Sequence, residues 1–191
     1  MEPIFTMQYG EFSVTDYLLK NLKNISAFIP ASAQEKGIDL LLYRHNNIHN
    51  QNQVVTFQVK MSRTYYNDLY KKQRSKKKYP YDLWFNRFEV QPNADWYILV
   101  GIYARHSKNI NARADSTYWD TIMLAFTNSE IRSFIENVRQ KKDSTKYDKM
   151  FGFSFDNDKR IDQTRGCAKP RDMSKYLIEN RINDINNSFD Q

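Results

Sequence analysis

Two apolar runs separated by a polar segment form the clearest pattern in the chain. The first run, 38–43, is almost entirely Leu and Ile, with one carboxylate, Asp39, near its start. The second run, 54–60, is rich in β-branched and aromatic residues. The segment between them, 46–53, is rich in Asn and Gln and is expected to be a loop. The pattern therefore predicts two neighbouring strands joined by a polar loop.

Polar and apolar residues alternate in the second run. Side chains two positions apart on a strand share a face, so Gln58 and Lys60 are expected to point the same way. The opposite face would then carry Val55, Phe57 and Val59. If the two strands pair, Asp39, Gln58 and Lys60 bring an acid, an amide and an amine to one place.

A helical pattern precedes these strands. Apolar residues recur at spacings of four, four and three at Val14, Leu18, Leu22 and Ile25. Glu11 lies three residues before this stripe and in phase with it, near the helix end that favours negative charge. Two interpretations stay open: Glu11 faces the same site as Asp39, or it complements the helix dipole and faces solvent.

The rest of the chain alternates short apolar runs with polar segments. Further strands are expected at 25–32, 96–104, 119–126 and 151–155. The aromatic-rich segment 81–90 suits a short helix or a strand, and 156–170 is polar. A capping-box pattern at 127–130 predicts a helix, and Asp172 or Ser174 could cap a last one. Strands that feed helices indicate an α/β or α+β protein, and no linker divides residues 1–191 into domains.

Composition narrows the setting in which the protein works. The 191 residues carry a net charge of +7 and a pI near 9.3, which suits a polyanionic partner. The single Cys167 cannot form an internal disulfide and is typical of a reducing compartment. The sequence predicts no membrane span and no signal peptide, so we expect a cytoplasmic protein.

Basic residues are concentrated after the second apolar run. Six positive charges fall within eight residues, at Lys71, Lys72, Arg74, Lys76, Lys77 and Lys78. Arg165 and Arg171 lie in a second basic stretch. These residues are candidates for contact with nucleic-acid phosphates, with nearby tyrosines available for packing or stacking. The alternative is that the charge run is a solvated loop.

Several kinds of active site lack support in the sequence. Five scattered glycines cannot form a phosphate-binding loop, and no cluster of His and Cys suits zinc. Glu11, Asp39, Gln58 and Lys60 remain as candidate catalytic residues. Carboxylate and amide oxygens suit Mg²⁺, and a lysine ammonium can stabilise the negative charge that develops during phosphodiester hydrolysis. Asp39 could equally be a strand-end carboxylate that accepts hydrogen bonds from the turn at Gly37.

The order and spacing of these residues resemble the PD-(D/E)XK nuclease superfamily, which has a restriction-endonuclease-like or junction-resolvase-like fold. In that superfamily an acid on the first helix precedes a strand-borne Asp, and a Glu or Gln, an apolar residue and a Lys follow on the next strand. The matching residues here are Glu11, Asp39, Gln58, Val59 and Lys60. Ile38 stands where the superfamily has its Pro, and Gln58 replaces the more usual acid. The resemblance covers about the first third of the chain and extends loosely to Trp96.

The resemblance implies a central mixed β-sheet flanked by helices in αβββαβ order, with a catalytic core at about 10–62. It implies a DNA endonuclease dependent on Mg²⁺, for which Mn²⁺ could substitute. Asp39 would be the central metal ligand and Lys60 the charge stabiliser. Glu11 and Gln58 would be auxiliary ligands or would orient water, and the backbone carbonyl of Val59 would be a further ligand.

Two other functions stay open at this point. The chain could keep the fold as a catalytically weak or inactive nucleic-acid-binding module. It could also be a scaffold whose tyrosine-rich surface meets another protein. Nuclease relatives that cut both strands often dimerise, so a homodimer is a further open alternative.

Overall fold

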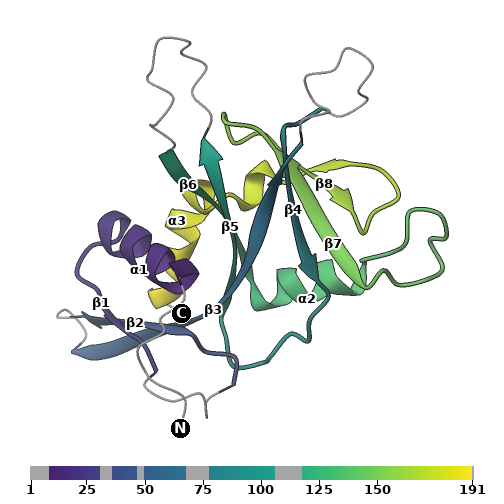
Figure 1. Cartoon of the computed structure of the whole chain (residues 1–191). Helices are drawn as coiled ribbons and strands as arrows, with labels where there is room; N and C mark the ends of the chain where they lie inside the picture. The colour runs from purple at the N-terminus through teal and green to yellow at the C-terminus, as the bar shows by residue number, and fades with distance from the viewer. Residues whose placement is uncertain (1–8, 31–35, 47–49, 68–77, 106–117, 191) are drawn as a thin grey trace, which may run out of the picture.

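The computed structural model describes five stretches of the chain. These are residues 9–30, 36–46, 50–67, 78–105 and 118–190. Over these residues the chain forms nine β-strands and three α-helices (Figure 1). The result is a mixed α+β fold built on a large, mostly antiparallel sheet.

Five strands form the first sheet, in the order β1-β2-β3-β5-β6. Their bounds are β1 (Ser26–Phe28), β2 (Leu40–Asn46), β3 (Gln51–Tyr66), β5 (Trp96–Arg105) and β6 (Tyr118–Thr127). β3 and β5 are parallel, and the other neighbouring pairs are antiparallel. β1 lies at the edge of the sheet and is shorter than the strand expected at 25–32, because it ends before Pro30, which cannot donate a ladder hydrogen bond.

The long strand β3 continues into a second sheet, in the order β3-β4-β7-β8-β9. The new strands are β4 (Tyr81–Asn86), β7 (Met150–Phe155), β8 (Ile161–Arg165) and β9 (Arg171–Asp172). β3 pairs with β5 over 57–63 and with β4 over 64–66. β3 therefore belongs to both sheets, and the core boundary expected near residue 62 falls inside it.

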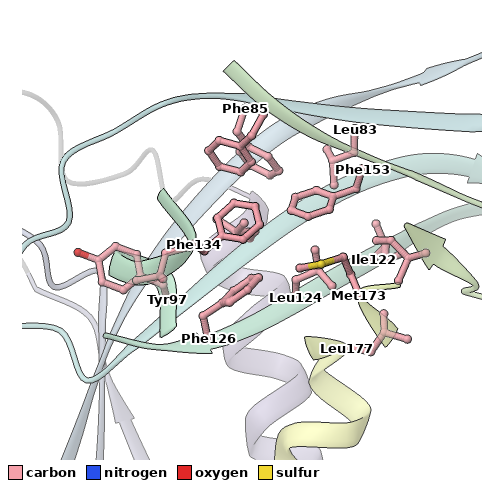
Figure 2. Close-up of a cluster of buried hydrophobic side chains, with 14 of the residues drawn as sticks. Leu83, Phe85, Tyr97, Ile122, Leu124, Phe126, Phe134, Phe153, Met173 and Leu177 are labelled. Atoms are coloured by element: carbon pink, nitrogen blue, oxygen red, sulfur yellow. The ribbon is translucent and has the colours of Figure 1, made fainter. Parts of the chain in front are cut away.

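One buried cluster lies between the two sheets, where α2 (Asn128–Glu136) closes it. Figure 2 shows how side chains from both sheets and from α2 meet there. Aromatic rings dominate this cluster, and its largest fully buried members include Tyr81, Tyr97, Tyr103, Phe126, Phe151, Phe153 and Phe155. Ring-to-ring packing therefore holds the second sheet against the first.

A second buried cluster lies on the other face of the first sheet, under α1 (Tyr9–Asn21) and α3 (Ile178–Asn187) (Figure 1). Helix α1 contributes Val14 and Leu18, and Leu22 follows directly after the helix, which confirms these positions of the predicted apolar stripe. β3 contributes Val55, Phe57 and Val59, which confirms that this alternate set points to one face. Gln58 and Lys60 consequently lie on the face turned away from α1.

Local sequence patterns predicted several strands and one helix start within a few residues of their observed bounds. The predicted strands at 96–104, 119–126 and 151–155 correspond to β5, β6 and β7. The capping box is confirmed: the Thr127 side chain accepts a hydrogen bond from the Glu130 amide, and the Glu130 carboxylate accepts one from the Thr127 amide. Arg181 of α3 donates to both carboxylate oxygens of Glu130, so the cap also ties α3 to α2.

The segments that connect the apolar runs differ from expectation. The loop predicted at 46–53 is shorter, because β2 runs to Asn46 and β3 starts at Gln51. Polar residues pair across this extension, Arg44 with Gln53 among them, so no apolar pattern marks it. The segment 81–90 holds a strand, β4. Where the expected αβββαβ order has a helix after its third strand, the chain has β4 instead.

The C-terminal part contains a strand that was not predicted, and the expected last helix has a different cap. The polar segment 156–170 contains β8, whose buried Gln163 takes an inward position that an apolar residue would normally hold. The last helix begins at Ile178, after Leu177, with no side-chain cap. Asp172 instead accepts hydrogen bonds from Ser174 and so fixes a short 3-10 turn that precedes the helix.

Candidate active site

The candidate site lies where β2 and β3 separate. β2 begins at Leu40, opposite Phe57, and the Asp39 amide still donates to the Phe57 carbonyl at 2.8 Å. Beyond this point the Asp39 carboxylate takes the place of the next rung, because its Oδ2 accepts a hydrogen bond from the Val59 amide at 2.7 Å. The Asp39 carboxylate is thus held against the open edge of β3. Its other oxygen, Oδ1, forms no hydrogen bond with the described residues.

Glu11 approaches this edge from the first turn of α1. Gly10 packs against Met61 of β3, so the start of the helix lies close to the strand. Burial raises the pKa of the Glu11 carboxyl, the charge of Asp39 raises it further, and the ammonium of Lys60 partly offsets the increase. Glu11 is therefore close enough to interact electrostatically with both Asp39 and Lys60. It does more than complement the helix dipole.

Gln58 is the buried polar member of the site. Its side chain is only 6% exposed, and its Oε1 has no hydrogen-bond partner among the described residues. Burying an amide oxygen without a partner costs about 1–3 kcal/mol. This oxygen is therefore available to accept a hydrogen bond or to ligate an ion.

Tyr97 is a neighbour of Gln58 that sequence analysis did not single out. Tyr97 lies beside Gln58 in the β3–β5 register, and its hydroxyl bonds the backbone of Gln91. Burial is the main reason that the pKa of the Tyr97 hydroxyl is raised. The Gln91 bond and Arg132 lower it, and the charge of Asp39 adds to the rise.

Lys60 is half-buried on the Gln58 face of β3. Its ammonium lies 6.0 Å from the centre of the Phe88 ring, and it forms no ion pair with the described residues. In the sequence, Phe88 is one of several aromatic residues in the segment 81–90, and nothing there indicated a contact with Lys60. Glu11 comes from the α1 face of β3 and Lys60 from the opposite face, and the Lys60 ammonium still lowers the pKa of the Glu11 carboxyl.

The donor set suits Mg²⁺ better than a transition metal. Within the part of the chain that the structure describes, no three His, Cys, Asp or Glu side chains come together as a metal site. The site offers two carboxylates and an amide oxygen. Val59, two residues after Phe57, presents its carbonyl to the same open edge. Oxygen ligands of this number fit Mg²⁺, which keeps several waters and takes one or two carboxylates. The unpartnered Gln58 Oε1 agrees with such an ion.

The predicted nucleic-acid-binding residues are only partly placed. Lys71, Lys72, Arg74, Lys76 and Lys77 lie outside the described residues. The described ones belong to the second sheet or the segment leading into it, and each already has a partner: Lys78 pairs with Asp162, Arg165 with Asp148, and Arg171 with Gln163 and the Phe134 ring. None of these contacts involves the Glu11–Asp39 site.

Among the described residues, no helix is long and apolar enough to cross a lipid bilayer. Comparisons with protein-family models, with curated proteins and with solved structures gave no match for this chain.

Proposed function

We propose that the chain is a Mg²⁺-dependent nuclease that hydrolyses DNA phosphodiester bonds, with a restriction-endonuclease-like core. The observation that carries the proposal is the Asp39 carboxylate held against the open edge of β3 by the Val59 amide, with the first turn of α1 packed on the same strand and Glu11 under the electrostatic influence of Asp39 and Lys60. These residues come from three elements separated in sequence. A helix acid, a strand-start Asp and a strand Lys would act together, and Gln58, whose buried oxygen has no partner among the described residues, would supply a further ligand.

The first sheet supports this proposal. A helix precedes three antiparallel strands, and the third of these has a parallel neighbour. The chain departs from the expected order by placing β4 in the crossover between the parallel strands. Such a crossover normally contains a helix. In this chain the second sheet takes its place and covers the same face of the first sheet.

Asp39, Gln58, Glu11 and the Val59 carbonyl would hold the ion. A bound Mg²⁺ would neutralise charge on the scissile phosphate and activate water for attack. Lys60 would stabilise the negative charge that grows on the phosphate in the transition state. Glu11, whose pKa is raised, is a better proton acceptor than an exposed glutamate, so it would orient the attacking water and take a proton from it.

The test is cleavage of plasmid and of labelled oligonucleotides by the purified chain with Mg²⁺, Mn²⁺ or EDTA. We expect cleavage with the ions only, and a loss of about 10²–10³-fold in Lys60→Ala. Lys146→Ala is a matched control, because Lys146 is an exposed lysine that pairs with Asp143 outside the site. An inactive wild type, or equal cleavage by Lys60→Ala and Lys146→Ala, would overturn the proposal.

One observation favours a second function. The site has two carboxylates, and Gln58 is neutral, so an ion would be held less tightly than in a site with three acids. The chain would then be a nucleic-acid-binding module of the same fold. Salt-dependent DNA binding without cleavage would identify it, whereas a protein-interaction scaffold would show no DNA affinity even at low salt.

A further inference from the structure

The end of β3 carries an exposed aromatic surface that the candidate active site does not use. Tyr65 is 51% exposed, and its ring centre lies 5.3 Å from that of Trp84 on β4, with an angle of 32° between the ring planes. Both rings lie on the face of the second sheet that points away from the buried cluster, because the inward positions hold Leu83 and Phe85. We call Tyr65 and Trp84 the aromatic platform.

A glycine makes room for the platform. Gly152 lies opposite Trp84 in the β4–β7 register, and a Cβ atom at Gly152 would lie 2.3 Å from Trp84 Cδ1. The indole therefore packs directly against the backbone of β7. Trp84 in turn supports the Tyr65 ring. An exposed ring backed by a second ring on a rigid sheet is fixed in place before any ligand arrives.

The charges around the platform favour an anion. Arg63, two residues before Tyr65 and on the same face, is exposed and forms no ion pair with the described residues. The nearby carboxylate is Asp82, opposite Tyr65 in the register. Asp82 is only 5% exposed and accepts a hydrogen bond from Ser154 at 2.6 Å. A free guanidinium thus flanks an open aromatic ring.

We propose that the aromatic platform stacks an unpaired base of single-stranded nucleic acid while Arg63 contacts a neighbouring phosphate. Aromatic side chains on a sheet surface bind bases through their ring faces, and this requires bases that are splayed out. A duplex interior keeps its base faces covered by neighbouring pairs. This inference rests on the proposed nuclease function and makes it more specific: the substrate would contain a single-stranded segment.

The position of the platform relates it to the candidate active site. Tyr65 and Lys60 lie on the same strand, five residues apart, which is about 17 Å along β3, and because this odd spacing turns their side chains to opposite faces, a bound strand would reach Lys60 around the open edge of β3. At the stacked rise of about 3.4 Å per nucleotide, this distance corresponds to about five nucleotides. A strand bound at both places would therefore have its unpaired base within about five nucleotides of the scissile phosphate.

The test measures binding in EDTA, where metal-dependent cleavage cannot occur. A fluorescein-labelled single-stranded oligonucleotide and a blunt duplex of the same sequence are titrated with wild type, Tyr65→Leu and Trp84→Leu. The matched control is Tyr147→Leu. Tyr147 is equally exposed, at 53%, but the guanidinium groups of Arg87 and Arg139 lie 4.2 and 3.9 Å from its ring centre. Its ring faces are therefore less available to a base.

We expect wild type and Tyr147→Leu to bind the single strand more tightly than the duplex. Tyr65→Leu should weaken single-strand binding by about 5- to 150-fold with an unchanged salt dependence, since it removes stacking and no charge. Arg63→Gln should instead lower the slope of log affinity against log salt by about 0.7. Tyr65 is exposed, so its variant keeps the test valid even if Trp84→Leu fails to fold.

Equal single-strand affinity of Tyr65→Leu and Tyr147→Leu would overturn the inference. Wild type that binds the duplex as tightly as the single strand, or that binds neither, would do the same. Failure of the nuclease proposal looks different: no cleavage with Mg²⁺, while Tyr65→Leu still loses single-strand binding in EDTA. Conversely, if cleavage requires Lys60 but single-strand affinity is the same in wild type and Tyr65→Leu, only the inference about the aromatic platform is overturned.

Discussion

The carboxylate of Asp39 accepts a hydrogen bond from the backbone amide of Val59 at 2.7 Å, across the fork between β2 and β3. One oxygen of Asp39 thus completes the sheet, and the other forms no hydrogen bond with the described residues. This division means that a structural and a chemical function can be separated by substitution at a single residue.

Asp39→Asn and Asp39→Ala should separate these two functions. Asn keeps an acceptor for the Val59 amide but lacks the negative charge, so we expect at least 10²-fold slower cleavage with a small change in Tm. Ala removes the acceptor as well, and should lower the free energy of unfolding by about 1–2 kcal/mol, or about 2–8 °C in Tm. Equal Tm values for the two variants would show that the Val59 bond contributes nothing.

Glu11→Gln should make the protein more stable and less active. The pKa of Glu11 is raised in the folded state, so the folded protein binds its proton more tightly than the unfolded chain. Wild type therefore loses stability as the pH rises from the ordinary glutamate value through the raised one. The Tm advantage of Glu11→Gln should be absent at low pH and grow over that window.

Thermal unfolding followed from acid to neutral pH checks this prediction, with Glu136→Gln, an exposed acid on α2, as the control. Cleavage by Glu11→Gln should fall by about 10²-fold, as expected for the loss of a proton acceptor. A variant that is less stable than wild type at neutral pH would contradict the burial and repulsion inferred at Glu11.

Gln58→Met should stabilise the metal-free protein and abolish its response to Mg²⁺. Methionine has a similar volume and no buried oxygen, so removal of the unpartnered Oε1 should add about 1 kcal/mol to the free energy of unfolding. A ligand that binds only the folded state raises Tm, so wild type should melt higher with Mg²⁺ than with EDTA. Gln58→Glu should show the reverse pattern: lower Tm in EDTA and a larger increase with Mg²⁺.

The same thermal scans with Ca²⁺ and with salt of matched ionic strength serve as controls for nonspecific effects. If Gln58→Met and wild type gain equally from Mg²⁺, the amide oxygen is not a ligand.

Gly152→Ala should destabilise the protein by displacing Trp84. The added Cβ would lie 2.3 Å from Trp84 Cδ1 and 3.0 Å from the Leu83 carbonyl oxygen, so the indole must move. We expect a cost of about 1–3 kcal/mol in the free energy of unfolding. The cost should shrink in a Trp84→Leu background, because residues in contact do not contribute additively. Chemical denaturation of the two single variants and the double variant measures this coupling, and additive costs would contradict the contact.

The sequence predicted those parts of the fold that local signals determine. The cap at Thr127 and Glu130 depends on residues three apart, and the apolar stripe of α1 depends on one helix face. β8 escaped prediction because Gln163, at 1% exposure, fills an inward position and hides the alternation. Its burial depends on Arg171, eight residues away, which donates to the Gln163 side chain. Such pairing cannot be deduced from residue type alone.

The sequence indicated which residues are candidates for the site, but not which contacts hold them in place. The spacing identified Glu11, Asp39, Gln58 and Lys60, and the alternation in β3 correctly placed Gln58 and Lys60 away from α1. The partner of Asp39 was not predictable. We considered the turn at Gly37, but the carboxylate bonds Val59, twenty residues away, because β2 leaves the sheet there. Tyr97 joins the site only through the β3–β5 register, which a single sequence does not reveal.

The 16 residues of β3 serve both sheets, and this constrains how the molecule can come apart. Loss of order anywhere along β3 removes rungs from β2, β4 or β5 together. The helix-covered half and the aromatic half therefore share one strand, and we expect neither to fold as an independent fragment. A mutation that bends β3 at Tyr65 is therefore expected to shift the position of Lys60 as well.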